Sequence, residues 1–188
     1  MWTSWQFWIP LVVAFFAMEV WSLVVHKMLW HGSLWWGHES HHVETDGYFE
    51  TNDLFAIFHA VIAAPMIYFG MLWQVHWVAG LGFGMTVFGF CYGVVHDGLV
   101  HGRLPVAFLA RIPYLRRVRS AHMSHHGTNP HSPPFGLFLG PWEMRRYHEQ
   151  RQRQRRRSDA GRPLAHRQIS KSPVVSATVQ RAGRSGAL

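Results

Sequence analysis

The sequence lacks the residues on which several common kinds of site depend. Its 188 residues include a single cysteine, Cys91, so neither a disulfide framework nor a thiolate-bound zinc site can form. No Ser-His-Asp set and no phosphate-binding loop accompanies the histidine-rich segments. Any transition-metal site therefore has to be built from imidazole.

Charge is also scarce, and it is unevenly spread. Charged residues make up 15% of the chain and hydrophobic residues 48%, which would suit a soluble domain if both were evenly distributed. Residues 5–25, 54–72 and 77–95 are instead almost free of charge, and each is about as long as the ~20 apolar residues that cross a bilayer. The sequence predicts an all-α, integral-membrane helical bundle with three full transmembrane helices. Shorter interfacial or half-membrane helices are expected at 104–115 and 135–142, apolar stretches that proline interrupts or brackets.

Basic residues concentrate toward the C-terminal end. Residues 1–142 hold 6 Lys/Arg and 7 Asp/Glu, whereas 143–188 hold 12 and 3, so the formal net charge of +8 divides into −1 and +9. The positive-inside rule places this end in the cytoplasm, and the chain is expected in the inner (cytoplasmic) membrane as a multi-pass protein. We expect two regions, a membrane domain at 1–142 and a basic, disordered tail at 143–188, which has too little apolar surface to fold alone.

Ten of the 15 histidines occur in two copies of one spacing. Each copy holds a pair with four residues between its members, followed by a triplet of the form His-x2-His-His, and each pair comes at the end of an apolar span. Neutral imidazole is the commonest protein ligand for borderline transition metals, so two half-sites of five predict a two-metal centre at the cytoplasmic membrane face. The candidate metal-binding and catalytic residues are His26, His31, His38, His41, His42, His96, His101, His122, His125 and His126.

Regular helix geometry accounts for the triplets better than for the pairs. Residues at i, i+3 and i+4 share a helix face, so each triplet is expected to aim its three imidazoles in one direction. Five residues at about 100° each place His26 and His31 about 140° apart on an α-helix. Gly32 and Gly102 follow the two pairs, and glycine commonly takes the left-handed position past a helix end. The second histidine of each pair is therefore expected where its helix stops.

The ligand chemistry favours iron, with zinc and copper as alternatives. Structural zinc tends to use cysteine, and magnesium or calcium would need oxygen ligands. The Glu-x-x-His spacing of carboxylate-rich di-iron bundles occurs only at Glu39 and His42. Glu39 and Asp97 are better suited to accept hydrogen bonds from ligand rings. A nitrogen-rich site beside lipid indicates oxygen chemistry on an apolar substrate, because no side-chain acid or base breaks an unactivated C–H bond, whereas iron with O₂ does.

The histidine motifs resemble those of the fatty acid hydroxylase superfamily of membrane histidine-box oxygenases. Within it they are most similar to the bacterial β-carotene hydroxylases, the carotenoid 3-hydroxylases. The resemblance covers roughly residues 18–140 and rests on His-Lys-Met-Leu-Trp-His-Gly at 26–32, His-Glu-Ser-His-His at 38–42, Asn-Asp-Leu-Phe-Ala at 52–56, His-Asp-Gly-Leu-Val-His at 96–101 and Ala-His-Met-Ser-His-His at 121–126. Residues 127–134 and the arginine-rich tail depart from the family pattern.

The resemblance implies a non-haem di-iron monooxygenase. Its substrates would be β-carotene, hydroxylated at C3 of the β-ionone rings to zeaxanthin via cryptoxanthin, and ketolated carotenoids such as canthaxanthin, converted to astaxanthin. It also implies O₂ and reduced ferredoxin as co-substrates, and it carries all ten histidines over as iron ligands or their close support. A carotenoid rod about as long as the ~30 Å hydrocarbon layer suits such a site.

The expected partners are a carotenoid, a ferredoxin-type electron donor and membrane lipid, and no nucleic acid. Arg116, Arg117 and Arg119 are candidates either for docking an acidic ferredoxin or for anchoring to lipid headgroups, and the basic tail is expected to contact anionic lipid. Two other functions remain open at this point. One is a related hydroxylase or desaturase that acts on a sterol, fatty acyl chain or alkane. The other is a membrane metal transporter, which would need polar residues along its spans, where the sequence offers only Glu19 and His59.

Overall fold

The computed structural model describes residues 4–43, 49–127 and 131–161, and these residues form helices and connecting turns without strands. The chain divides into two compact units, Met1–Arg145 and Arg146–Leu188. The first unit contains the three long helices and all ten histidines of the repeated spacing. It is therefore the unit that positions the candidate site.

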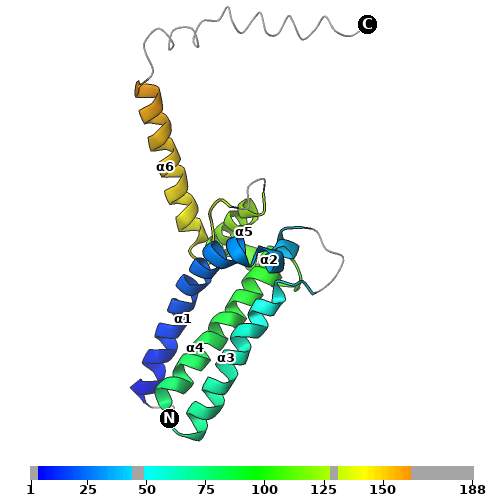
Figure 1. Ribbon diagram of the computed structural model, residues 1–188, viewed down its shortest axis with the longest axis vertical. Coiled ribbons are helices and arrows are strands. Elements are labelled where there is room, and N and C mark those ends of the chain that lie inside the picture. The colour runs from blue at the N-terminus through cyan, green and yellow to red at the C-terminus, as the bar shows by residue number, and fades with distance from the viewer. Residues whose placement is uncertain (1–3, 44–48, 128–130, 162–188) are drawn as a thin grey trace, which may run out of the picture. The chain divides into compact units, whose positions relative to one another are not determined.

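Three helices are long and apolar enough to cross a membrane, which confirms the three predicted spans. They are α1 (Trp5–Val25), α3 (Asp53–Leu72) and α4 (His76–Gly93), shown as a bundle in Figure 1. Large apolar side chains cover their outer faces: Phe16 is 67% exposed, Val61 65% and Phe90 72%. Apolar surface of this extent suits contact with lipid chains rather than water.

Helix α4 lies between the other two and packs closely on both. A Cβ atom added at Gly80 or Gly84 would lie 2.3 Å from the backbone oxygen of Phe7 or Leu11 in α1, so these two positions accept only glycine without a shift of backbone. On the other side, a Cβ at Gly82 would lie 2.9 Å from the Ala63 oxygen of α3. The small residues at 80–84 thus allow the backbone of α4 to approach both neighbouring helices closely.

Two short π-helices extend the long helices beyond the predicted spans. Helix η1 (His26–Ser33) continues α1, and η2 (Val94–Val100) continues α4. Their hydrogen bonds join residues five apart, as from the His101 amide to the His96 oxygen at 3.0 Å. Gly102 takes the expected left-handed conformation with φ +72°. Gly32 does not: it lies within η1 with φ −120° and ψ −119°, so the expectation is wrong there.

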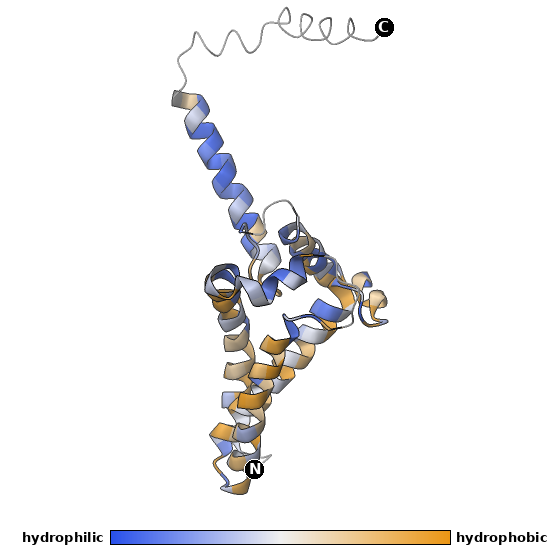
Figure 2. Ribbon diagram, turned by 45° about the vertical axis from the view of Figure 1, so that its right-hand side comes forward, coloured by the Kyte–Doolittle hydropathy of each residue, from blue (hydrophilic) through white to orange (hydrophobic). Residues whose placement is uncertain are grey.

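The remaining short helices gather at one end of the bundle. Helix α2 (Trp35–His42) follows η1, whereas η3 (Ala107–Arg111) and α5 (Pro113–His125) follow η2. Figure 1 shows α2 and α5 at the same end of α1, α3 and α4, and Figure 2 shows that polar residues concentrate at this end while the bundle is largely hydrophobic. The predicted short helix at 104–115 is confirmed in part, since η3 and the start of α5 lie there. Residues 135–139 form no helix, which corrects the helix expected at 135–142.

The last described helix, α6 (Gly140–Gly161), corrects the expectation of a disordered region from residue 143. Its sequence is rich in Arg, Gln and Glu, which are good helix formers even where no tertiary contact supports them. Residues 148–160 are exposed, as expected for a segment that buries little apolar surface. Residues 162–188 of the predicted tail lie outside the described part of the chain.

Candidate metal centre

All ten predicted histidines come together at the end of the bundle where the π-helices lie. Seven are buried and three, His42, His101 and His126, are half-buried. Nine of the ten form two groups in which the candidate ligand nitrogens lie within 4.8 Å of one another. We name these groups site A, which consists of His26, His31, His38, His42 and His125, and site B, which consists of His41, His96, His101 and His122.

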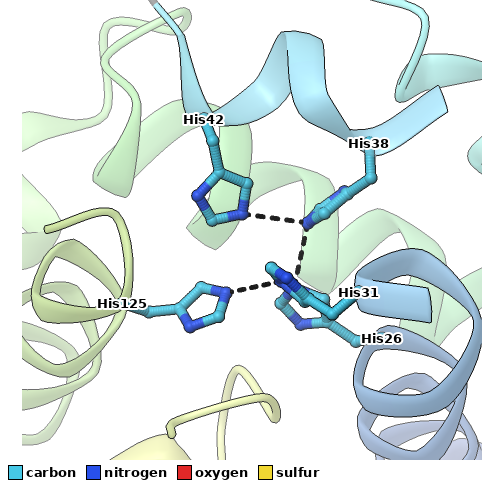
Figure 3. A group of neighbouring side chains, drawn as sticks. All are labelled: His26, His31, His38, His42 and His125. Atoms are coloured by element: carbon cyan, nitrogen blue, oxygen red, sulfur yellow. Dashed lines mark hydrogen bonds between the residues drawn. The ribbon is translucent and has the colours of Figure 1, made fainter. Parts of the chain in front are cut away.

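In site A the Nε2 atoms point toward a common centre, as Figure 3 shows. Neighbouring Nε2 atoms are 2.9–3.2 Å apart along the series His42, His38, His26, His31 and His125. Where an outer nitrogen donates its hydrogen elsewhere, the facing Nε2 atom carries a lone pair. Lone pairs directed at one point could hold a metal ion, and they do not form a network of hydrogen bonds.

Site B has the same character, and the tenth histidine, His126, lies next to both sites, with its ring 4.4 Å from that of His42 in site A. The Nε2 atoms of His41 and His96 are 3.0 Å apart, and the His126 ring lies 4.7 Å from that of His41 and 4.9 Å from that of His101. The His126 Nε2 is 2.9 Å from the His122 Nε2. Site A thus has five imidazoles and site B has four, with His126 beside both.

The two sites exchange one histidine between the copies of the repeat. Site A takes four residues from the first copy and His125 from the second, whereas His41 of the first copy joins the second copy in site B. The expectation that each triplet aims all its rings in one direction is therefore wrong. Successive residues of an α-helix point about 100° apart, so α2 directs His41 and His42 into different sites. The second triplet is divided as well, with His122 in site B and His125 in site A.

The π-turns explain the pairs that an α-helix left unexplained. Because the backbone bond in a π-helix joins residues i and i+5, side chains five apart lie above one another. The rings of His26 and His31 are 4.8 Å apart in η1, and those of His96 and His101 are 4.7 Å apart at the end of η2. The spacing of each pair thus matches the period of the helix that carries it.

Outer ring nitrogens are held by acceptors around the sites, which orients the inner nitrogens. In site A, His26, His38 and His125 donate from Nδ1 to the Phe135 oxygen, the Asn52 side-chain oxygen and the Ser132 oxygen at 2.6, 2.7 and 2.8 Å. In site B, His41 donates to Glu50 at 3.0 Å and His96 donates to Asp97 at 2.8 Å.

Burial keeps the imidazoles neutral, as metal ligation requires. Loss of solvent and the neighbouring imidazoles lower the pKa of His42 and His101 to about 3 and that of His126 to about 2. Burial also lowers the pKa of His38 to about 4, although its hydrogen bond to Asn52 acts in the opposite direction. At neutral pH these rings are therefore available as donors.

Several residues that support the site were not assigned to it from the sequence. Glu50 lies outside the histidine motifs, and Asn52 was named only as part of the 52–56 motif, whereas its side chain accepts from His38. Asp97 accepts a ring hydrogen as expected, but Glu39 is exposed and the described contacts give it no histidine partner. The carbonyls of Phe135 and Ser132 have no sequence signal, because any residue type supplies a backbone oxygen.

Residues 131–139, a described segment after the last triplet, pack against site A. The Phe135 ring lies 5.5–5.8 Å from the rings of His26, His31 and His125. This segment is held by two carboxylates: Glu143 accepts from the Phe135 and Gly136 amides at 3.0 and 2.8 Å, and the buried Glu19 accepts from the Leu139 amide at 2.7 Å. Glu19 therefore faces the bundle and this segment.

An apolar cavity of about 290 Å³ reaches the metal centre from within the bundle. Residues of α1, α3 and α4 line it, and it ends at His96 and Asp97. Its lining includes Trp30, Phe55, Phe88 and Tyr92. The cavity suits a flat hydrocarbon group brought next to site B.

One hydrogen bond joins the helices on either side of this cavity. Trp21 of α1 donates from Nε1 to Nε2 of His59 in α3 at 3.0 Å, and the His59 Nδ1 donates to the Phe55 oxygen at 2.7 Å. Both ring nitrogens of His59 are thus engaged within the bundle. His59 is not a member of either metal site, as expected for a histidine outside the repeated spacing.

The amino-acid sequence was compared with protein families and with known proteins, and it is similar to one family and to several hydroxylases. The sequence model of the fatty acid hydroxylase family matches residues 11–145. Beta-carotene 3-hydroxylase 2 of Arabidopsis thaliana is 50% identical over 131 residues, which are 68% of this chain and 43% of the relative. Beta-carotene hydroxylase of a Paracoccus species is 41% identical over 135 residues, which are 69% of this chain and 82% of the relative.

The match to the chloroplast proteins is partial in length. The chain spans less than half of the Arabidopsis protein and of the similar beta-carotene hydroxylase 2 of Capsicum annuum, which is 50% identical over 131 residues. No solved structure matches the chain. Residues 11–145, which the family model matches, contain both copies of the histidine spacing.

Proposed function

Because the chain belongs to the fatty acid hydroxylase family, we propose that it is an O₂-dependent carotenoid 3-hydroxylase with a di-iron centre. The observation that carries the proposal is the convergence of nine imidazoles into sites A and B, with His126 beside them, directly next to an apolar cavity within a membrane bundle. Similarity to proteins named beta-carotene hydroxylases supports the choice of substrate.

The donor set fits iron as the resident metal. Ten imidazoles and no cysteine among the described donors favour a borderline transition metal, and the acceptors on the outer nitrogens fix the rings for ligation. When bound, the iron pair supplies activation of O₂ for insertion of one oxygen atom into a C–H bond. The balanced reaction consumes the C–H compound, O₂, two electrons and two protons, and yields the alcohol and water.

The protein would orient the substrate by packing. In this proposal a β-ionone ring enters the cavity between α1 and α3 and lies against Phe55, Phe88 and Tyr92, with its reacting carbon toward the histidine end. The polyene would extend among the lipid chains. The apolar lining excludes water from the reacting carbon, which prevents loss of reducing equivalents to side reactions.

Production in a β-carotene-accumulating bacterial host tests the activity. We expect zeaxanthin, with cryptoxanthin as the intermediate, and loss of both products in a His125→Ala variant that still inserts into the membrane. Unchanged β-carotene together with a hydroxylated sterol or fatty acid would contradict the carotenoid assignment and favour another substrate of the same family. Metal flux into vesicles without O₂-dependent product would contradict an oxygenase altogether.

We further propose that the histidine end faces the cytoplasm at the inner membrane and receives electrons from an acidic ferredoxin. Arg116, Arg117 and Arg119 support this, since all three are exposed on α5, the helix that carries His122 and His125. Replacement of Arg116 and Arg117 by glutamate should slow electron delivery more at low salt than at high salt. Arg155→Glu, on the exposed part of α6, is the control, and equal rates for both variants would contradict the docking site.

A further inference from the structure

The two metal sites differ in the charge of the groups that hold their histidines. Site A is surrounded by neutral acceptors, whereas two carboxylates accept ring hydrogens in site B. Both sites are otherwise built from imidazoles of the same repeated spacing, five in site A and four in site B beside His126. The structure therefore offers a physical reason for the two metals to be held unequally.

Around site A, the described contacts to outer nitrogens come from two backbone carbonyls and one amide oxygen. A carboxylate is linked to these contacts only indirectly. Glu143 accepts from the Gly136 amide, and the Phe135 oxygen of the same peptide group accepts from His26. Its charge thus reaches the ring only through a peptide group. A cation also lies close, since the Lys27 ammonium is 5.9 Å from the centre of the Phe135 ring.

Around site B, Glu50 and Asp97 contact the rings of His41 and His96 directly. Arg103 holds these carboxylates in place: it forms an ion pair with Glu50, another with Asp53 at 3.1 Å, and lies 4.0 Å from Asp97. Three carboxylates against one guanidinium leave a formal charge of −2 at the edge of site B. The rigid guanidinium fork fixes the direction of the acceptors without cancelling their charge.

A carboxylate that accepts the Nδ1 hydrogen gives the ring imidazolate character, which makes its Nε2 a stronger donor than a carbonyl acceptor does. The net negative charge also attracts a divalent cation over a few ångströms in a partly buried site. We propose that site B binds its metal more tightly than site A, so that the centre fills in order, and that Glu50 and Asp97 are the positioning residues responsible. This inference rests on the proposed two-metal centre.

Titration of the metal-free full-length chain with Co²⁺ in lipid nanodiscs tests the order of filling. Co²⁺ bound by several imidazoles has visible absorption, so each equivalent is counted without any turnover. We expect two Co²⁺ per chain, the first bound at least about tenfold more tightly than the second. Equal affinities for the two equivalents would overturn the inference.

Isosteric substitutions assign the tighter site. Glu50→Gln and Asp97→Asn each keep an acceptor of similar shape but remove the charge, and each should weaken binding at site B about 10- to 100-fold, so that the first equivalent is weakened and the two sites fill together or in reversed order. Asn52→Asp is the opposite change in site A, next to His38, and should tighten the second equivalent. If Glu50→Gln and Asp97→Asn fail to fold for loss of the Arg103 ion pairs, Asn52→Asp alone decides.

The outcomes separate this inference from the proposed function. Weakening of only the second equivalent by Glu50→Gln or Asp97→Asn, or an unchanged second equivalent in Asn52→Asp, would refute the unequal sites while two metals still bind. Fewer than two Co²⁺ per folded chain would refute the two-metal centre itself. Two Co²⁺ bound in order, with no carotenoid product in cells, would leave the inference standing and overturn only the substrate assignment.

Discussion

At the scale of single residues, the centre depends on imidazoles that stay neutral because they are buried together. Direct hydrogen bonds from ring nitrogens to protein acceptors hold several of them, among them His38 to Asn52 and His41 to Glu50. Rings that face one another cannot all be protonated, since like charges in a confined space repel. The same arrangement that suits a metal therefore makes the metal-free site sensitive to acid.

The metal-free protein should lose stability as the pH falls below about 6.5. The pKa of His42 and His101 is lowered to about 3 in the folded chain, and an unfolded histidine titrates near 6.5. Below that value the unfolded state binds protons that the folded state cannot, so stability is full above about pH 6.5 and declines toward pH 4.

Thermal unfolding in nanodiscs between pH 8 and pH 4 measures this dependence. The metal-loaded protein is the control, because bound metal competes with protons and should delay the decline to lower pH. A melting temperature of the metal-free protein that stays constant down to pH 4.5 would contradict the neutral-imidazole account.

The gathering of the ten histidines was predictable, but their division between sites A and B was not. The repeated spacing is a one-dimensional pattern, so it identified all ten histidines, including His41 and His125. Their exchange between sites depends on where α2 and α5 lie relative to each other, which is a tertiary property. Glu50 was missed because it lies eight residues beyond the nearest histidine motif, and a lone glutamate has no distinguishing pattern.

At the scale of elements, the π-turns and the glycine contacts of α4 position the site. Each π-helix continues a membrane helix. An α-helix has 3.6 residues per turn, whereas the hydrogen bonds of a π-helix join residues five apart and bring their side chains close together. The pair spacing of the histidines was visible in the sequence, yet interpreted with an α-helix it predicted rings about 140° apart. A rare helix type has no propensity signal of its own, so only the structure shows it.

Gly80→Ala should destabilise the bundle, whereas Gly89→Ala should not. An added Cβ at Gly80 would lie 2.3 Å from the Phe7 oxygen, so α1 and α4 would have to separate, at a cost of about 1–3 kcal/mol. The space around Gly89 is open, and alanine there should be neutral or stabilise by about 0.5–1 kcal/mol. Melting temperatures of both variants in one detergent check this, and equal values would refute the close contact.

Ala60→Phe should impair use of a full-length carotenoid. Ala60 lines the cavity and is exposed at the same time, so it lies where the cavity opens. A phenyl ring there should narrow the entrance beside the Trp21–His59 hydrogen bond and raise KM for β-carotene. Val61→Phe is the matched control, since Val61 is 65% exposed and does not line the cavity.

Both variants should keep the metal content of the parent protein, which shows that the helices still assemble. If Ala60→Phe turns over β-carotene with unchanged KM, the substrate does not enter through this cavity. If Val61→Phe is equally impaired, the effect arises from the added bulk on the lipid face.

At the scale of the whole molecule, the region needed for the centre ends near residue 145. The family match ends at 145, and the first compact unit ends at Arg145. Three apolar spans and a basic end were readable from composition, because both are averages over many residues. Helix α6 was not predicted as a helix, since its lack of apolar residues indicated only that no core forms there.

Two truncations that differ by seven residues test how far the functional unit extends. A chain that ends at residue 149 keeps Glu143, whose carboxylate holds the Phe135 and Gly136 amides and through them the acceptor of the His26 ring. It should retain nearly all hydroxylation and bind two metals.

A chain that ends at residue 142 loses that carboxylate, so residues 135 and 136 beside site A are no longer held and the more weakly bound metal should be lost first. Product and metal per inserted chain are the measurements. Equal loss in both truncations would mean that the basic segment itself is required, and full retention in both would mean that Glu143 does not support the centre.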